Sequence, residues 1–195
     1  GSAAACGTQP GGSRFDTTVQ GRTANGPYGG KNHRMPTNLY VSAPLRGKTC
    51  GVITTVAFNP FYGDIDPAAM ARLMMIEAVT KAVVAGADYR DLALCDNFYT
   101  PRLRPDVAWD LREMVRVISD LSIELGIPFI SGKDSSSGTM ESDGRRIDVP
   151  PTLVVSAFGR VPDVKKIITK ESKRAGNRLV LVGKTSGGYL GGTVY

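Results

Sequence analysis

The sequence predicts an α+β fold in which two helices cover one face of a mixed β-sheet. Runs rich in β-branched residues alternate with two long segments of helical periodicity, in the approximate order β-α-β-α-β-β-β. The chain has 195 residues, of which 42% are hydrophobic, so it is long enough to bury a core of its own. We therefore expect one domain with an irregular extension.

Both predicted helices have start and stop signals. Asp66-Pro67 supplies an N-cap followed by a first-turn proline, and Gly86 ends that segment. The second helix begins near Pro105 and ends at Gly126, and its apolar residues occupy about a third of the circumference. The first helix is apolar nearly all round, which predicts that it is buried.

Glu77 and Lys81 are four residues apart on the first helix. The stripe that contains them is otherwise apolar, with Met70, Leu73, Met74 and Val84. A charge in such a stripe must be paired or liganded, so the pair is either an internal salt bridge or one wall of an anion or metal site. The simpler alternative is an ordinary i, i+4 pair that stabilises a helix by ~0.2–0.5 kcal/mol.

The expected strands are residues 49–58, 92–95, 128–130, 151–160 and 178–182, with a polar hairpin around Asp143-Gly144. Residues 1–36 are rich in Gly, Thr, Asn and Pro, which predicts an extended arm or linker before a domain over residues 37–186. Gly1-Ser2 looks like a remnant of an expression vector.

The strongest local signal for function is the stretch SGKDSSSG, residues 131–138, which follows a predicted strand. In a loop, backbone N–H groups freed by glycine can converge on phosphate oxygens, and a lysine supplies the counter-charge. The Walker spacing is absent, so a flexible serine-rich turn is the alternative. The candidate phosphate ligands are Ser131, Gly132, Lys133 and Ser135.

Asp96-Asn97 follows a short predicted strand and could hold Mg²⁺ or a ribose, although this pair is also a common turn former. His33 is the single histidine, so we expect no Ser-His-Asp or Cys-His nucleophilic system and assign no catalytic side chain.

The formal charge of +6 suits either a nucleic-acid binder or an enzyme that handles phosphates. The basic residues are scattered, or gathered in residues 165–174 without interleaved aromatics, so we expect no nucleic-acid partner. Three cysteines at unrelated spacings, Cys6, Cys50 and Cys95, favour a reducing cytoplasm. Because no apolar run approaches the ~20 residues of a membrane span, no membrane partner is expected.

Five segments resemble, in order, the synthetase part of the phosphoribosylformylglycinamidine synthase family. They are DTTVQG (16–21), GPYGG (26–30), residues 65–88, FISGKDS (129–135) and residues 150–164. That family makes formylglycinamidine ribonucleotide from formylglycinamide ribonucleotide, ATP and glutamine. Its superfamily includes aminoimidazole ribonucleotide synthetase, whose N-terminal domains are α+β and pair into a shared β-barrel. The resemblance implies a fragment from the second synthetase half, with residues 187–195 starting the link to a C-terminal domain.

The resemblance also implies the chemistry. The full-length ligase uses ATP and Mg²⁺, with a first synthetase half and a glutaminase domain or subunit as partners, and the isolated fragment is expected to be inactive and to bind neither cofactor. Homodimerisation through the sheet is a further expectation. A scaffold half that only completes the barrel, and an ATP-binding domain of a related synthetase or kinase, are the alternatives.

Individual positions carry the resemblance unevenly. Gly132 falls on a loop glycine linked with nucleotide or phosphate binding, and Ser135 on a serine that contacts substrate. Lys133 stands where small relatives have a magnesium-binding asparagine. Glu77 matches a metal-binding glutamate, but Lys81 replaces the asparagine that partners it. These departures imply that this half has lost its auxiliary metal and nucleotide site while keeping the phosphate loop.

Overall fold

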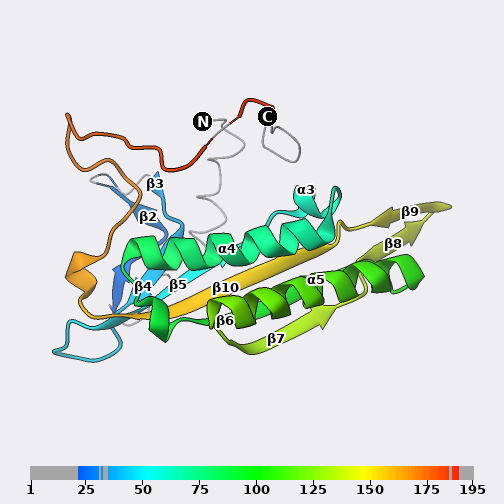
Figure 1. The fold of residues 1–195 in the computed structure, drawn as a ribbon, viewed down its shortest axis with the longest axis horizontal. Coiled ribbons are helices and arrows are strands. Elements are labelled where there is room, and N and C mark those ends of the chain that lie inside the picture. Colours follow the sequence, from blue (N-terminus) through cyan, green and yellow to red (C-terminus); the bar gives the residue numbers. More distant parts are fainter. Residues whose placement is uncertain (1–21, 31, 33–34, 185, 189–195) are drawn as a thin grey trace.

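A computed structural model describes residues 22–30, 32, 35–184 and 186–188. Within them, a six-stranded sheet has the order β1-β4-β5-β10-β6-β7 and carries two long helices, α4 and α5, on one face (Figure 1). All neighbouring strands are antiparallel except β6 and β7, which are parallel. The predicted mixed sheet with helices on one face is confirmed. The strands of this sheet are β1 (Thr23–Asn25), β4 (Leu39–Ser42), β5 (Gly51–Ala57), β6 (Ala93–Tyr99), β7 (Phe129–Ser135) and β10 (Thr152–Val161).

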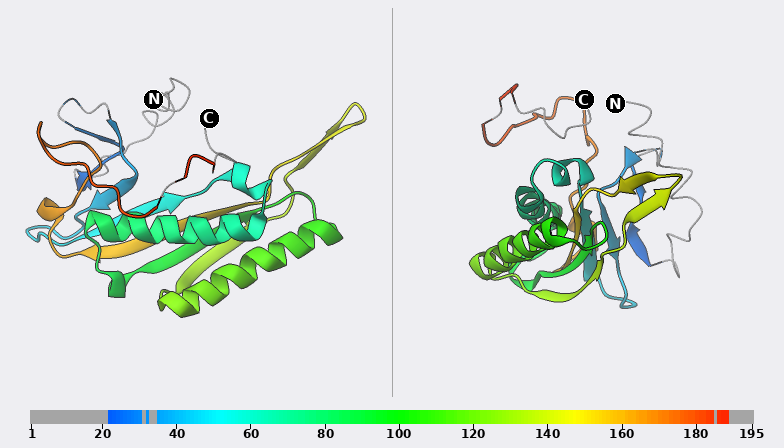
Figure 2. Two further views of the ribbon diagram at one scale, coloured as in Figure 1. Left: turned by 45° about the horizontal axis from the view of Figure 1, so that its top comes forward. Right: turned by 90° about the vertical axis from the view of Figure 1, so that its right-hand side faces the viewer.

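The remaining elements surround this sheet. Figure 2 shows the β8–β9 hairpin projecting beyond the end of the sheet, and both long helices on the same side. The hairpin turns at Asp143 and Gly144, which both have positive φ, as the sequence predicts. The bounds are β2 (Tyr28–Gly29), β3 (Met35–Pro36), α3 (Pro60–Gly63), α4 (Pro67–Ala85), η2 (Tyr89–Asp91), α5 (Pro105–Leu125), β8 (Thr139–Ser142), β9 (Arg145–Asp148) and η3 (Val164–Lys166).

The core lies between the sheet and the two helices. Alternate residues of β5, β10 and β6 face the helices and are buried, among them Ile53, Val155 and Leu94. The inner side of α4 is rich in alanine, so the helix lies close to the sheet, and the Thr55 hydroxyl donates a hydrogen bond to the Ala78 carbonyl oxygen at 2.7 Å. The opposite face of the sheet has no helix over it among the described residues.

Both helices begin and end where the sequence predicts. Asp66 caps α4 by accepting a hydrogen bond from the backbone N–H of Ala69 at 2.9 Å, and Pro67 follows it. Gly86 and Gly126 end α4 and α5 in the left-handed conformation, with φ of 114° and 67°, where a side chain would be strained.

The prediction that α4 is buried nearly all round is wrong. Met70 and Met74 are buried as expected, but Leu73, Glu77 and Val84 are exposed. The buried side consists instead of methionines, alanines and Val79, and the small alanines allow the helix to approach the sheet. A helix that is apolar on every side gives no periodic signal to show which side the sheet will cover.

Two strand predictions also need correction. β6 continues through Asp96-Asn97 to Tyr99, so this pair lies inside a strand and forms no turn. Residues 178–182, although described, form no strand, and the side chains of Leu179, Val180, Leu181 and Val182 are 73–95% exposed. A β-branched run predicts only that a segment can pair, and the neighbouring strand decides whether it does.

Several sequence features lie outside the described residues: Gly1-Ser2, Cys6, the DTTVQG segment, His33 and Leu190. Part of the predicted arm is described, and its β1 pairs with β4 at one edge of the sheet. Cys50 and Cys95 are free thiols. Among the helices that the structure describes, none combines the length and the apolar character needed to cross a bilayer.

Candidate functional site

The stretch predicted as a phosphate loop is mostly a strand. Residues 131–135 belong to β7, whose partners on β6 run from Cys95 opposite Ser131 to Tyr99 opposite Ser135. The loop prediction is therefore wrong for these residues, and their amides cannot converge on one point. Glycine and serine usually mark turns, but a strand at a sheet edge accepts polar residues because one of its sides is open.

The alternation of β7 separates the candidate ligands. Asp96 pairs with Val155 on one side and Gly132 on the other, and Val155 faces the helices. Gly132 therefore lies on the helix face. Ser131, Lys133 and Ser135 follow one another along the opposite, open face, where alternate residues are ~6.6 Å apart. The structure thus brings three of the four candidates together in one row.

Lys133 and Ser135 converge within that row. The Lys133 ammonium donates a hydrogen bond to the Ser135 hydroxyl oxygen at 2.6 Å, and the Lys133 side chain is exposed. An exposed lysine beside hydroxyl groups can donate to the oxygens of an anion. This convergence comes from side chains two residues apart on one face of a strand.

Gly132 makes room for the Asp96 carboxylate. A Cβ atom at residue 132 would lie 2.2 Å from Asp96 Oδ1 and 2.5 Å from its Cγ, closer than real Cβ atoms come. Burial raises the pKa of the Asp96 carboxyl, and a hydrogen bond from the backbone N–H of Lys133 opposes that shift. Gly132 thus packs directly against Asp96. The spacing of the two residues in the sequence does not predict this contact.

Two polar groups near this end of β6 lack partners among the described residues. The Asn97 amide oxygen and the Thr100 hydroxyl are both buried without a hydrogen bond. Asn97 lies opposite Lys133 in the register, and the backbone N–H of Thr100 donates to the Ser135 carbonyl oxygen at 2.9 Å. A buried unpaired polar group costs about 1–3 kcal/mol, so a ligand or partner that satisfied these atoms would be stabilised here. Thr100 carries no sequence signal.

Glu77 and Lys81 form an ion pair far from this row. Glu77 Oε1 and Lys81 Nζ are 2.5 Å apart, with side-chain exposures of 48% and 22%, and Lys81 also donates to the Val56 carbonyl oxygen at 2.9 Å. The salt bridge is confirmed, but its burial is not. Since Val56 belongs to β5, strands β10 and β6 separate this pair from β7.

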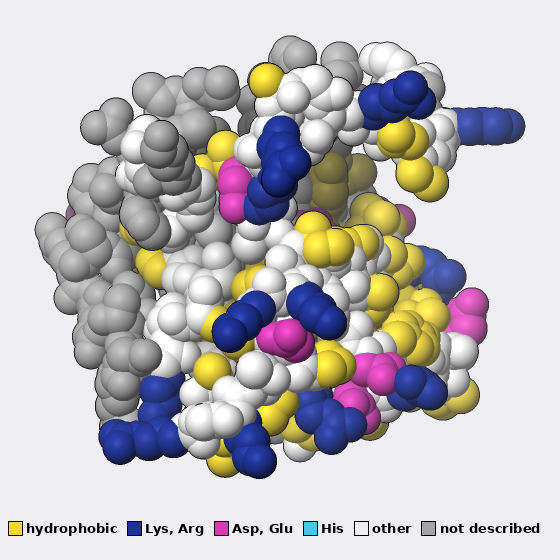
Figure 3. Space-filling view, turned by 90° about the vertical axis from the view of Figure 1, so that its left-hand side faces the viewer, with side chains coloured by type: hydrophobic (Ala, Val, Ile, Leu, Met, Phe, Trp, Pro, Cys, Tyr) yellow, Lys and Arg dark blue, Asp and Glu magenta, His cyan; other side chains and the backbone are white. Residues whose placement is uncertain are grey.

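Basic side chains gather at the opposite end of the sheet from the hairpin, but not in a continuous patch. Figure 3 shows that end, where Lys and Arg are interspersed with acidic and hydrophobic side chains. Two of the arginines are paired there, Arg90 with Asp88 at 2.8 Å and Arg160 with Asp91 at 2.7 Å. This distribution agrees with a solvated face.

Comparison with known proteins identifies the family. A family model described as the FGAR-AT PurM_N-like domain matches residues 13–160, well over half of the chain. The chain belongs to the FGAR-AT PurM_N-like domain family. The chain is similar to the phosphoribosylformylglycinamidine synthase subunit PurL of Methanothrix thermoacetophila, with 32% identity over 189 residues. The matched region covers 93% of the chain and 23% of the relative.

Two solved structures have folds similar to that of this chain. PurLQS from Thermotoga maritima superposes with a TM-score of 0.66 at 22% identity, over 84% of the chain and 25% of that structure. Thermotoga maritima PurL in complex with ATP superposes with a TM-score of 0.58 at 22% identity, over 80% of the chain and 23% of that structure. The chain spans about a quarter of the length of the curated relatives it matches.

Proposed function

We propose that this chain is part of a phosphoribosylformylglycinamidine synthase and that the open face of β7 binds the phosphate of formylglycinamide ribonucleotide. Family membership supports the enzyme class, since a relative that covers 93% of the chain bears that name. The row of Ser131, Lys133 and Ser135 supports the site. Because β7 is a strand, the proposal rests on side-chain donors and not on a cradle of backbone amides.

The reaction asks this part of the enzyme for positioning. In the full-length ligase, ATP transfers its γ-phosphoryl group to the amide oxygen of the substrate and leaves as ADP. Ammonia derived from glutamine then attacks the amide carbon, and inorganic phosphate departs with the former amide oxygen. A lysine and two serines that hold the ribose phosphate fix the substrate relative to the reacting amide without taking part in bond making. Lys133 supplies the positive charge, and the Ser131 and Ser135 hydroxyls supply neutral donors.

A divalent ion does not fit at Glu77. The Lys81 ammonium already lies 2.5 Å from Glu77 Oε1, and the described residues contain no group of three or more His, Cys, Asp or Glu side chains that could hold a metal ion. This arrangement supports the proposal that the chain has lost the auxiliary metal and nucleotide site. We therefore propose that other parts of the enzyme bind ATP and Mg²⁺. We also propose that the enzyme is cytoplasmic.

Substitution of Lys133 tests the phosphate proposal. In the complete synthase, Lys133→Ala should raise KM for formylglycinamide ribonucleotide about 10- to 150-fold, because a hydrogen bond to a charged group contributes ~1.5–3 kcal/mol. Lys48→Ala is the matched control. Lys48 is an exposed lysine just before β5, which β10 and β6 separate from β7 in the sheet, so its loss should leave KM unchanged. An unchanged KM for Lys133→Ala would refute the assignment.

The scaffold alternative has one observation in its favour. The open face of the sheet exposes Val52, Val56 and Tyr99, and apolar side chains on a sheet favour packing against another chain or domain. If barrel formation is the chain's main role, Val56→Glu should abolish self-association in light scattering, and Lys133→Ala should leave the kinetics of the intact enzyme unaltered.

A further inference from the structure

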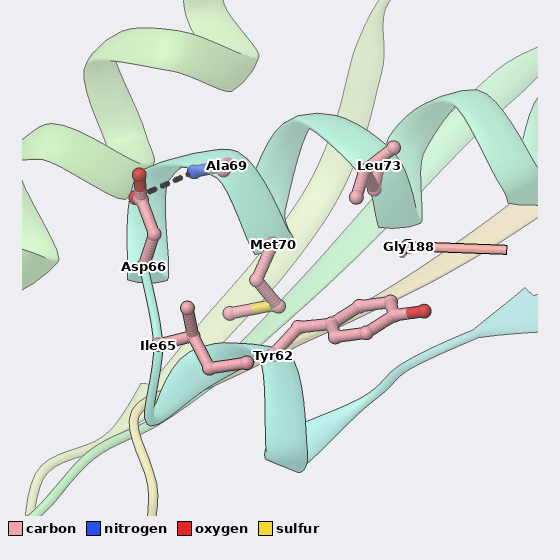
Figure 4. A pocket seen from close by; sticks show the side chains of 7 residues that line it. All are labelled: Tyr62, Ile65, Asp66, Ala69, Met70, Leu73 and Gly188. Carbon is pink, nitrogen blue, oxygen red and sulfur yellow. Dashed lines mark hydrogen bonds between the residues drawn. The ribbon is translucent and has the colours of Figure 1, made fainter. Parts of the chain in front are cut away.

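An apolar groove lies on the helix side of the molecule, away from the sheet face discussed above. It has a volume of about 380 Å³ and lies between the turn of α3 and the first half of α4. Figure 4 shows Tyr62 and Ile65 on one side, with Ala69, Met70 and Leu73 of α4 on the other and Gly188 at one end.

The chemistry of the groove suits an apolar occupant. Ile65 is 64% exposed and Leu73 is 49% exposed, so water now covers side chains that would be stabilised by burial. The charged side chain at the groove, Asp66, already accepts a hydrogen bond from the Ala69 backbone N–H as the N-cap of α4. A molecule or segment that binds in the groove therefore needs no charge to pair with Asp66.

The chain itself supplies a segment at the mouth of this groove. Gly188 is part of the groove lining together with Leu73 and Tyr62, so the residues that follow it in the sequence are candidates to occupy the groove. The residues that follow are YLGGTVY, with four large apolar or aromatic side chains and no charge. Seven extended residues span at most ~25 Å, more than enough to cover the groove.

We propose that Tyr189 and Leu190 bind in this groove and fasten the C-terminal segment to α3 and α4. The two glycines that follow, Gly191 and Gly192, then give the chain freedom to turn away after the contact. The contact sets where the polypeptide beyond residue 190 leaves the domain, and it concerns a surface separate from the phosphate row on β7.

Hydrogen exchange of the α3 and α4 amides tests the proposal. A chain that ends at Gly188 should exchange the Ile65–Leu73 amides at least about threefold faster than the 195-residue chain, since an apolar cover over them has been removed. Leu73→Lys should accelerate exchange similarly. Because both changes remove one contact, the truncation should have no further effect in the Leu73→Lys background. Ile65→Lys serves as a second variant of the groove.

Val84→Lys is the matched control, because Val84 is exposed on the same helix but lies outside the groove. In that background the truncation should keep its full effect. Equal exchange in the truncated and 195-residue chains would overturn the proposal, as would additive effects of truncation and Leu73→Lys. Protection that rises with protein concentration would also overturn it, by assigning the groove to a second copy.

Discussion

Adding one methyl group at Gly132 should destabilise the chain through Asp96. In Gly132→Ala the new Cβ atom would lie 2.2 Å from Asp96 Oδ1 and 2.5 Å from Cγ. Rotating the carboxylate about its last bond leaves Cγ in place, so the whole side chain must change rotamer or the two strands must separate. Overpacking of this kind typically costs ~1–3 kcal/mol in the free energy of unfolding.

Urea unfolding of Gly132→Ala, Asp96→Ala, the double variant and one control variant measures the coupling between the two residues. Gly132→Ala should lower the free energy of unfolding by about 1–3 kcal/mol, and Asp96→Ala combined with it should recover most of that loss. Gly187→Ala is the control, because a Cβ there meets no atom within 4 Å and should change little. A neutral Gly132→Ala, or a double variant whose losses simply add, would refute the packing argument.

Three further results are expected. Lys81→Met should lower the free energy of unfolding by about 0.5–1.5 kcal/mol in urea titrations, since both Glu77 and the Val56 carbonyl lose a donor, and no loss would show that these contacts do not form in solution. The pKa of Glu171 is lowered from 4.5 to about 2, chiefly by hydrogen bonds from Lys173 and Thr169. The folded-state pKa of Glu171 lies below its unfolded value, so the carboxylate stabilises the folded state above about pH 4.5, and this stabilisation is lost as the pH falls toward 2. Glu171→Gln should therefore flatten the plot of the free energy of unfolding against pH over that range. An unchanged plot would contradict this prediction. Titration calorimetry with MgATP should give no binding heat, whereas saturable heat would show that a nucleotide site survives in this chain.

The elements that could be predicted are those with strong local signals. Asp66-Pro67, Gly86 and Gly126 determine helix ends through hydrogen bonds and φ values of neighbouring residues, so these ends were predictable. The buried side of α4 was not, because its apolar residues surround the helix and the sheet alone decides which are covered. Residues 178–182 have the composition of a strand but pair with no strand among the residues that the structure describes.

The candidate site was predictable in its residues but not in its form. Ser131, Lys133 and Ser135 could be selected by type, because phosphate needs hydroxyl and ammonium donors. Their placement on one face of β7 depends on pairing with β6, and that pairing is set by the α5 crossover. The contact between Gly132 and Asp96 joins residues 36 positions apart and exists only once that register has formed.

The most direct measurement is a crystal structure of the intact synthase with formylglycinamide ribonucleotide bound. Phosphate binding by Lys133 predicts a substrate phosphate oxygen within ~3 Å of Lys133 Nζ, and a second within hydrogen-bonding distance of the Ser131 or Ser135 hydroxyl. A substrate phosphate held by another element, with Lys133 still donating only to Ser135, would contradict it.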